Sequence, residues 1–175
     1  MEISHSNYVT TVTAPLQRVA ATLNDRVASG NLPAVSRLGI WSVVASHVLE
    51  RFVEGFSRVR KCSVPGRGLM TLDVGNAYAI MSRAGPTLPT VLSRDKGFVD
   101  AYISAFYLES ESDLLSWVAR VRSSYSLRHV RAIVQHGPIA TKKTPKQLKE
   151  VMDALDALYL APREQLMHTT GGGAV

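Results

Sequence analysis

Apolar side chains recur at three- and four-residue steps along most of the chain, and this period restricts the fold more than any other feature. The clearest case lies between residues 34 and 61, where the apolar positions are Leu38, Trp41, Ala45, Val48, Phe52, Phe56 and Val59. An α-helix turns once in 3.6 residues, so such steps line one helix face. No segment alternates convincingly with the period of two that a strand requires. The sequence therefore predicts an all-α fold.

The same period indicates an elongated bundle of about six to seven helices. They are expected around residues 16–28, 34–61, 69–80, 93–106, 112–121, 126–136 and 145–161. "SRAGPTLPT" (residues 82–90) holds two prolines and a glycine and is the clearest linker. With 175 residues, 46% of them hydrophobic, we expect one domain over residues 1–162 and a flexible tail over residues 163–175.

Several helix starts carry a side chain that accepts a hydrogen bond from the first helical turn. The predicted N-caps are Ser63, Ser93, either Ser110 or Ser112, and Thr144. Thr144 is the strongest of these, because Pro145 suits the first helical position and Gln147 completes a capping box.

Charge is unevenly distributed in a chain whose net charge is +6. Residues 114–149 contain no Asp or Glu but eight basic residues: Arg120, Arg122, Arg128, Arg131, Lys142, Lys143, Lys146 and Lys149. An acidic cluster, Glu109, Glu111 and Asp113, immediately precedes them. This asymmetry indicates an anionic partner, either nucleic acid, acidic lipid or an acidic protein surface, or else a solvated basic face without a dedicated ligand.

"FSRVRKCSVPGRGLMTLD" (Phe56 to Asp73) concentrates basic residues, two glycines and the single cysteine. A phosphate-binding P-loop would need G-x-x-x-x-G-K-[ST] after a strand, and neither the spacing nor the lysine of that motif is present. A corner between two helices explains the segment better, with Ser63 capping the second helix and Gly66 relieving crowding.

Catalytic chemistry is weakly indicated. Cys62 lies beside Arg60 and Lys61, which would favour a thiolate, but a lone cysteine at a helix junction is usually a packing residue. The five histidines are scattered, and His129 and His136 lack further metal ligands nearby. No enzyme activity, cofactor or metal is expected. A pocket that joined Cys62 to a histidine would revive the enzyme hypothesis.

"RFVEGFSRVRKCSVPGRGLMTLD" (Arg51 to Asp73) resembles the hallmark segment of syndetin C-terminal domains, approximately F-V-E-G-[FY]-x-x-V-[KR]-[KR]-C-S-x-x-G-R-x-L-M-x-L-D. "FVDAYISAFYLESESDLLSWV" (Phe98 to Val118) resembles a second block of that family, and "YSLRHVRAIV" and "KKTPKQLKEVMDALDAL" resemble the helices that follow. The resemblance spans about Pro33 to Leu160. It departs from the family at Gly75, where bulky residues are usual, and in a less charged linker.

The resemblance implies a non-catalytic domain of a vesicle-tethering complex subunit that acts in endosomal recycling and retrograde transport. The family protein is far longer and carries an N-terminal coiled-coil region for assembly. The implied partners are other subunits of the tethering complex, SNAREs or small GTPases, with peripheral contact to acidic membranes. The implied location is the cytoplasmic face of recycling endosomes and trans-Golgi membranes.

The candidate partner or lipid contacts are the basic residues of the corner and of the later basic stretch. They are Arg58, Arg60, Lys61, Arg67, Arg120, Arg122, Arg128, Arg131, Lys142, Lys143 and Lys146. A basic helical nucleic-acid-binding domain is the alternative, but its reader motif is missing, so nucleic acid is disfavoured as a partner.

Overall fold

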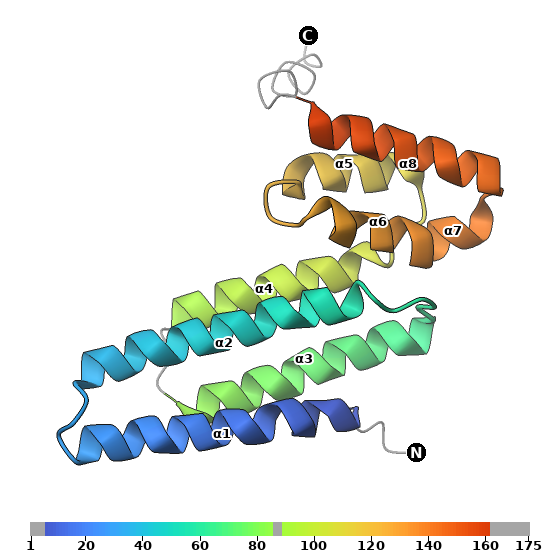
Figure 1. Cartoon of the computed structure of the whole chain (residues 1–175). Coiled ribbons are helices and arrows are strands. Elements are labelled where there is room, and N and C mark those ends of the chain that lie inside the picture. The colour runs from blue at the N-terminus through green and yellow to red at the C-terminus, as the bar shows by residue number, and fades with distance from the viewer. Residues whose placement is uncertain (1–5, 86–88, 162–175) are drawn as a thin grey trace, which may run out of the picture. The chain divides into compact units, whose positions relative to one another are not determined.

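The computed structural model describes residues 6–85 and 89–161, and within them it contains eight helices and no strand (Figure 1). The helices are α1 (Asn7–Ala28), α2 (Ala34–Phe56), α3 (Val64–Ala84), α4 (Pro89–Ala105), α5 (Glu111–Val121), α6 (Leu127–His136), α7 (Pro138–Lys142) and α8 (Pro145–Leu160). The predicted all-α fold is confirmed.

The chain forms two compact units. Unit 1 comprises Met1–Phe56 and Ser63–Ile103, and unit 2 comprises Ser57–Cys62 and Ser104–Val175. The single domain over residues 1–162 stays a prediction. The tail predicted over residues 163–175 lies outside the described residues.

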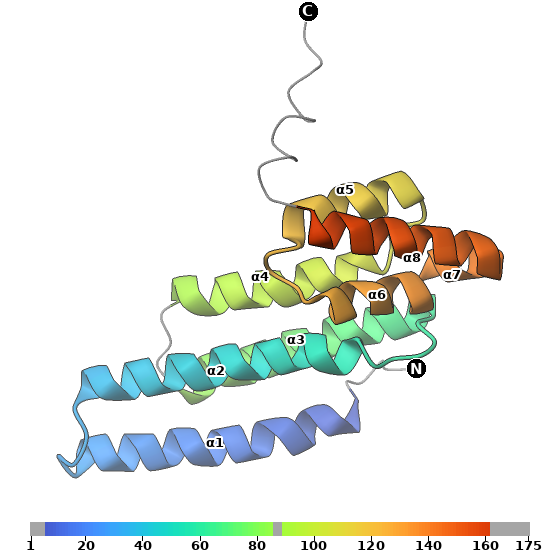
Figure 2. The same cartoon turned by 45° about the horizontal axis from the view of Figure 1, so that its top comes forward.

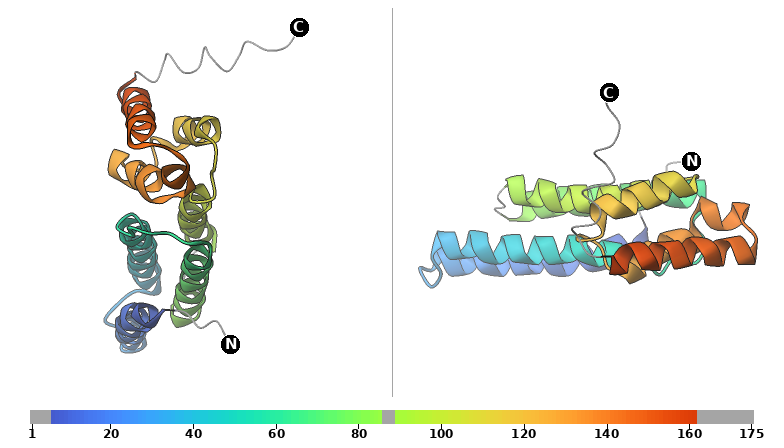
Figure 3. Two further views of the ribbon diagram at one scale, coloured as in Figure 1. Left: turned by 90° about the vertical axis from the view of Figure 1, so that its right-hand side faces the viewer. Right: turned by 90° about the horizontal axis from the view of Figure 1, so that it is seen from above.

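Unit 1 is built on three long helices, with α1 packed against α3 and α2, and α2 also packed against α3. They run alongside one another in Figure 2, and the left view of Figure 3 shows them nearly end-on. Their apolar faces supply the core, which includes the fully buried Trp41, Leu49 and Val74. Burial of such faces is the main source of stability in a bundle of this kind.

A buried carboxylate joins the start of α1 to α3. Asp73 is 2% exposed, and its oxygens accept hydrogen bonds from the Ser6 backbone N–H at 2.7 Å and the Tyr8 hydroxyl at 2.8 Å. Burial, the hydrogen bond to Asp73 and the charge of that carboxylate raise the pKa of Tyr8. The neutral phenol therefore stays the donor, and the buried charge is solvated by protein groups in place of water.

Unit 2 packs α8 against α5 and α6, and α6 against α7. Leu114, Val118, Val130, Val151 and Leu155 are fully buried in its core. The N-caps predicted for this unit are confirmed: Ser110 accepts from the Asp113 N–H, and Thr144 forms the complete capping box with Gln147.

Several helix boundaries differ from the sequence prediction, including both ends of the helix expected over residues 69–80, which is α3 (Val64–Ala84). The helix expected over 34–61 ends at Phe56, and the first helix starts at Asn7 and runs through Pro15. Ser93 is no cap, because α4 already begins at Pro89, a residue that suits the first helical position. The linker between α3 and α4 is correspondingly shorter than residues 82–90.

The count of six to seven helices was too low. Gly137 and Pro138 end α6 as predicted, but Pro138 also begins α7, because the missing N–H of proline costs nothing at a helix start. Gly75, which the sequence marked as an interruption, lies inside a continuous α3.

Gly85 offers a test of packing in unit 1. A Cβ at Gly85 would lie 2.5 Å from the Trp41 ring, which is fully buried. We expect Gly85→Ala to lower the free energy of unfolding by about 1–3 kcal/mol through overpacking. Gly75→Ala is the matched control, since its Cβ would meet nothing within 4 Å, and it should raise stability by up to about 1 kcal/mol. Urea unfolding followed by circular dichroism measures both, and equal stability of the two variants would contradict the packing argument.

Candidate contact surface

The candidate basic residues fall into two sets that the structure treats differently. The first set belongs to the basic connector, which we define as residues 57–63 between α2 and α3. The second set belongs to the basic run, which we define as residues 120–149 of unit 2.

The basic connector presents its charges to solvent. Its backbone turns at Ser57 and Arg58 and then continues without regular structure until α3 begins at Val64. Arg58, Arg60 and Lys61 are exposed. Arg67, which the sequence grouped with them, lies in the first turns of α3 and is only 7% exposed.

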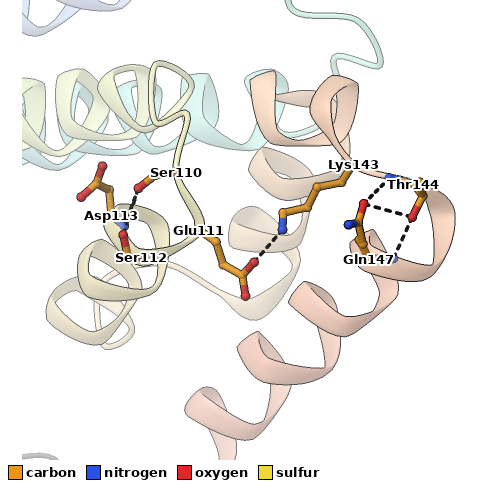
Figure 4. Close-up of polar contacts among 7 residues, drawn as sticks. All are labelled: Ser110, Glu111, Ser112, Asp113, Lys143, Thr144 and Gln147. Carbon is orange, nitrogen blue, oxygen red and sulfur yellow. Dashed lines mark hydrogen bonds and ion pairs between the residues drawn. The ribbon is translucent and has the colours of Figure 1, made fainter.

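Two lysines of the basic run pair with the acidic cluster at the start of α5. Lys142 Nζ lies 2.6 Å from Glu109 Oε2, and Lys143 Nζ lies 2.7 Å from Glu111 Oε2. Figure 4 shows the second pair, with Lys143 reaching from the turn before α8 to Glu111 at the start of α5. Charges that lie far apart in the sequence thus offset one another in the fold.

Arg131 is likewise engaged inside unit 2. Its guanidinium donates through Nε and Nη2 to the two carboxylate oxygens of Asp156 on α8, in a bidentate pair. The hydrogen bond to Asp156 raises the pKa of Arg131. Because a guanidinium matches a carboxylate in this geometry, the pair fixes α6 against α8 more specifically than a lysine would.

Arg122 binds the end of α8. Its Nη1 donates to the backbone carbonyls of Leu158 and Ala161, each at 2.8 Å. The last carbonyls of a helix have no partner within the helix and carry partial negative charge, so a cation is favourable there.

A second contact joins the same turn to α8. The Tyr159 hydroxyl donates to the Tyr125 carbonyl at 2.6 Å, and the Tyr125 ring stacks on Trp117 with centroids 5.5 Å apart. Tyr125 is only 5% exposed, and this burial raises the pKa of its hydroxyl to about 12.

The basic residues at the surface are therefore fewer than the sequence indicated. Besides Arg58, Arg60 and Lys61, the exposed members of the candidate set are Arg120, Arg128, Lys142 and Lys146, and of these Lys142 is paired with Glu109. Lys146 and the neighbouring Lys149 are followed four residues later by Glu150 and Asp153, which are exposed on the same side of α8. The basic run does not present a uniformly basic face on α8.

The enzyme hypothesis gains no support from the described residues. They contain no group of three or more His, Cys, Asp or Glu side chains placed to hold a metal ion. A hollow of about 280 Å³ in unit 1 is lined by Gln17, Ala21, Asn24, Ile80, Arg83 and Ala84, a set without the nucleophile and base that covalent catalysis requires. Within the same residues, no helix combines the length and apolar character needed to cross a bilayer.

The chain matches the family model "Syndetin, C-terminal" over residues 1–153. It is 29% identical over 154 residues to syndetin of Gallus gallus and 28% identical over 154 residues to syndetin of Mus musculus. Each match covers 87% of this chain but only 16% of the relative, so the chain spans about one sixth of the length of these relatives. No solved structure matches.

Arg122 offers a test of how unit 2 is held together. We expect Arg122→Gln to lower the free energy of unfolding by about 1–3 kcal/mol, because charge-assisted hydrogen bonds to two helix-end carbonyls are lost. Arg120→Gln removes the same charge from an exposed residue two positions earlier and should change stability by less than about 0.5 kcal/mol. Thermal and urea unfolding compare the two variants, and equal effects would mean that net charge, not the contact with α8, is what matters.

Proposed function

The chain belongs to the syndetin C-terminal family, and from this premise we propose that it is a non-catalytic domain of a vesicle-tethering complex subunit. The family match over residues 1–153 carries the proposal. In this proposal the domain acts in endosomal recycling and retrograde transport, peripherally on recycling endosomes and trans-Golgi membranes. Its partners are other trafficking proteins, such as complex subunits, SNAREs or small GTPases.

The helical architecture suits this role. A tether works by binding, so it needs surfaces held by a stable scaffold and no reaction centre. Both units supply such scaffolds, with apolar cores that include Trp41 in unit 1 and Leu155 in unit 2. Because the chain covers 16% of its syndetin relatives, we assign it one contact function within a longer protein's activity.

The basic connector is the contact surface that the structure supports best. It places three basic side chains, Arg58, Arg60 and Lys61, within four consecutive exposed or half-buried residues. A basic residue near an anionic leaflet contributes about 1 kcal/mol, so three together would strengthen binding by about a hundredfold. In the basic run, Lys142, Lys143 and Arg131 bind carboxylates of unit 2.

A domain exchange tests the proposed function. Cells that lack their own syndetin would express a chimera. In this chimera, the chain replaces the residues of mouse syndetin that match it at 28% identity. We expect the chimera to restore return of an internalised receptor to the cell surface better than a syndetin with the matched residues deleted. Receptor return is measured by surface labelling, with equal expression of both proteins as the control. A stable chimera that performs no better than the deletion would contradict the proposal.

A sedimentation assay with liposomes tests the contact surface. The chain would be mixed with neutral or phosphatidylserine vesicles at low and physiological salt. If acidic membrane is the partner, binding should require the anionic lipid and fall by about a hundredfold when Arg58, Arg60 and Lys61 become Glu. The triple variant of Arg120, Lys146 and Lys149 to Glu is the charge-matched control.

The two variants separate three outcomes. If lipid binding is lost only in the variant of Arg58, Arg60 and Lys61, the basic connector is the contact. Equal loss in both variants indicates attraction by net charge, which would contradict a defined contact. No binding by the unmodified chain at either salt would exclude direct lipid contact and leave protein recognition as the proposed task.

A further inference from the structure

The basic connector ends in a serine that has arginines three and five positions before it. The segment Arg58-Val59-Arg60-Lys61-Cys62-Ser63 has the pattern R-x-R-x-x-S. We propose that Ser63 is a phosphorylation site for a basophilic serine/threonine kinase, a kinase whose substrate cleft carries carboxylates that bind these two arginines. Guanidinium–carboxylate pairs of this kind are bidentate and strong, so they select such a segment from other serines.

The backbone of the connector suits a kinase cleft. Substrates bind kinases in an extended conformation, where side chains two residues apart point to the same side. Residues 59–63 form no helix, and Ser63 itself is extended, with φ −74° and ψ 165°. The chain turns at Arg58 and bends at Arg60, so this stretch would have to straighten to place both arginines on one wall of a cleft, but α2 ends at Phe56 and would not have to unwind.

The Ser63 hydroxyl is accessible to a phosphoryl donor. Ser63 is exposed, and its Oγ accepts one hydrogen bond, from the Gly66 N–H at 3.2 Å. A Cβ at Gly66 would lie 3.3 Å from this oxygen, so the glycine leaves the hydroxyl uncovered. The hydroxyl is held by this one hydrogen bond, while the Ser63 carbonyl accepts from the Arg67 N–H at the start of α3.

The transfer balances with ATP as the donor. Ser63 Oγ bonds to the γ-phosphorus of ATP, and the bond between that phosphorus and the β,γ-bridging oxygen breaks as ADP leaves. The hydroxyl proton passes to the catalytic carboxylate of the kinase. The product is phosphoserine, which carries a charge of about −1.5 to −2 at neutral pH.

Phosphorylation would offset much of the positive charge of the basic connector. Arg58, Arg60 and Lys61 carry three positive charges, and the phosphate would reduce their sum to about +1. The phosphate would also lie at the N-terminus of α3, where helix amides favour an anion, so α3 should tolerate it. If the basic connector binds acidic membrane, as the proposed function has it, the modification would weaken that binding.

Ser123 supplies a comparison within the same chain. It is exposed and has Arg120 three residues before it. However, Arg120 lies in the last turn of α5, and Arg122 is bound to the end of α8, so this segment could straighten only if the end of α5 unwound and the contact with α8 broke. We expect the folded chain to be phosphorylated at Ser63 in preference to Ser123.

The experiment incubates the folded chain with a purified basophilic kinase and ATP, and follows phosphate incorporation by intact mass and fragment-ion sequencing. One phosphate should appear at Ser63. Ser63→Ala should abolish it, and Arg60→Gln should slow it by roughly tenfold or more, since one guanidinium–carboxylate contact is lost. Ser123→Ala should leave the rate unchanged, and circular dichroism confirms that every variant is folded.

Incorporation that persists in Ser63→Ala, or a rate unaffected by Arg60→Gln, would overturn the proposal. So would a short peptide of residues 57–68 that is phosphorylated while the folded chain is not, because the fold would then mask the serine. These readouts need neither a membrane nor a tethering complex. Failure of the proposed function therefore leaves the result on Ser63 intact. The phosphorylated chain can then enter the liposome assay, where weaker binding would link the two.

Discussion

Helix ends are the constraint on which this structure depends. Every helix leaves backbone N–H groups at its start and carbonyls at its end without partners inside the helix, and a chain of many short helices multiplies them. Hydroxyl side chains satisfy the starts of α3, α5, α6 and α8, through Ser63, Ser110, Ser126 and Thr144. A guanidinium from a neighbouring turn satisfies the end of α8. The positions of these capping side chains in the sequence help to determine where the helices begin and end. The helix bounds in turn determine which apolar faces pack together.

The starts of helices were largely predictable from the sequence, because capping is local. Ser63, Ser110 and Thr144 bond to amides three residues ahead, a distance that a sequence pattern can contain. Ser93 failed for an equally local reason, since Pro89 provides an earlier start for α4. The end of α8 was predicted within one residue, but the group that binds it, Arg122, lies 36 residues before Leu158 and could not be found from a local pattern.

Charge pairs between segments could not be found from the charge pattern for the same physical reason, because the two partners lie apart in the sequence. A stretch of 36 residues without a carboxylate looked like a surface for an anionic partner, yet three of its members bind carboxylates of unit 2. Two of those carboxylates, Glu109 and Glu111, lie just before the stretch, so their proximity in sequence was the available signal. For Asp156 on α8, which lies 25 residues after Arg131, proximity in sequence offered no such signal. Arg67 similarly shares a sequence segment with Arg58 and Arg60 but is buried in the fold.

The contacts around α5 and α8 have a mechanical consequence. Glu111 at the start of α5 binds Lys143 just before α8, and Arg122 just after α5 binds the last carbonyls of α8, so the two helices run in the same direction and are joined at both ends. The end of α8 is therefore held by Arg122 in addition to its own helical hydrogen bonds, so fraying of α8 from its last turn must first break the contacts with Arg122.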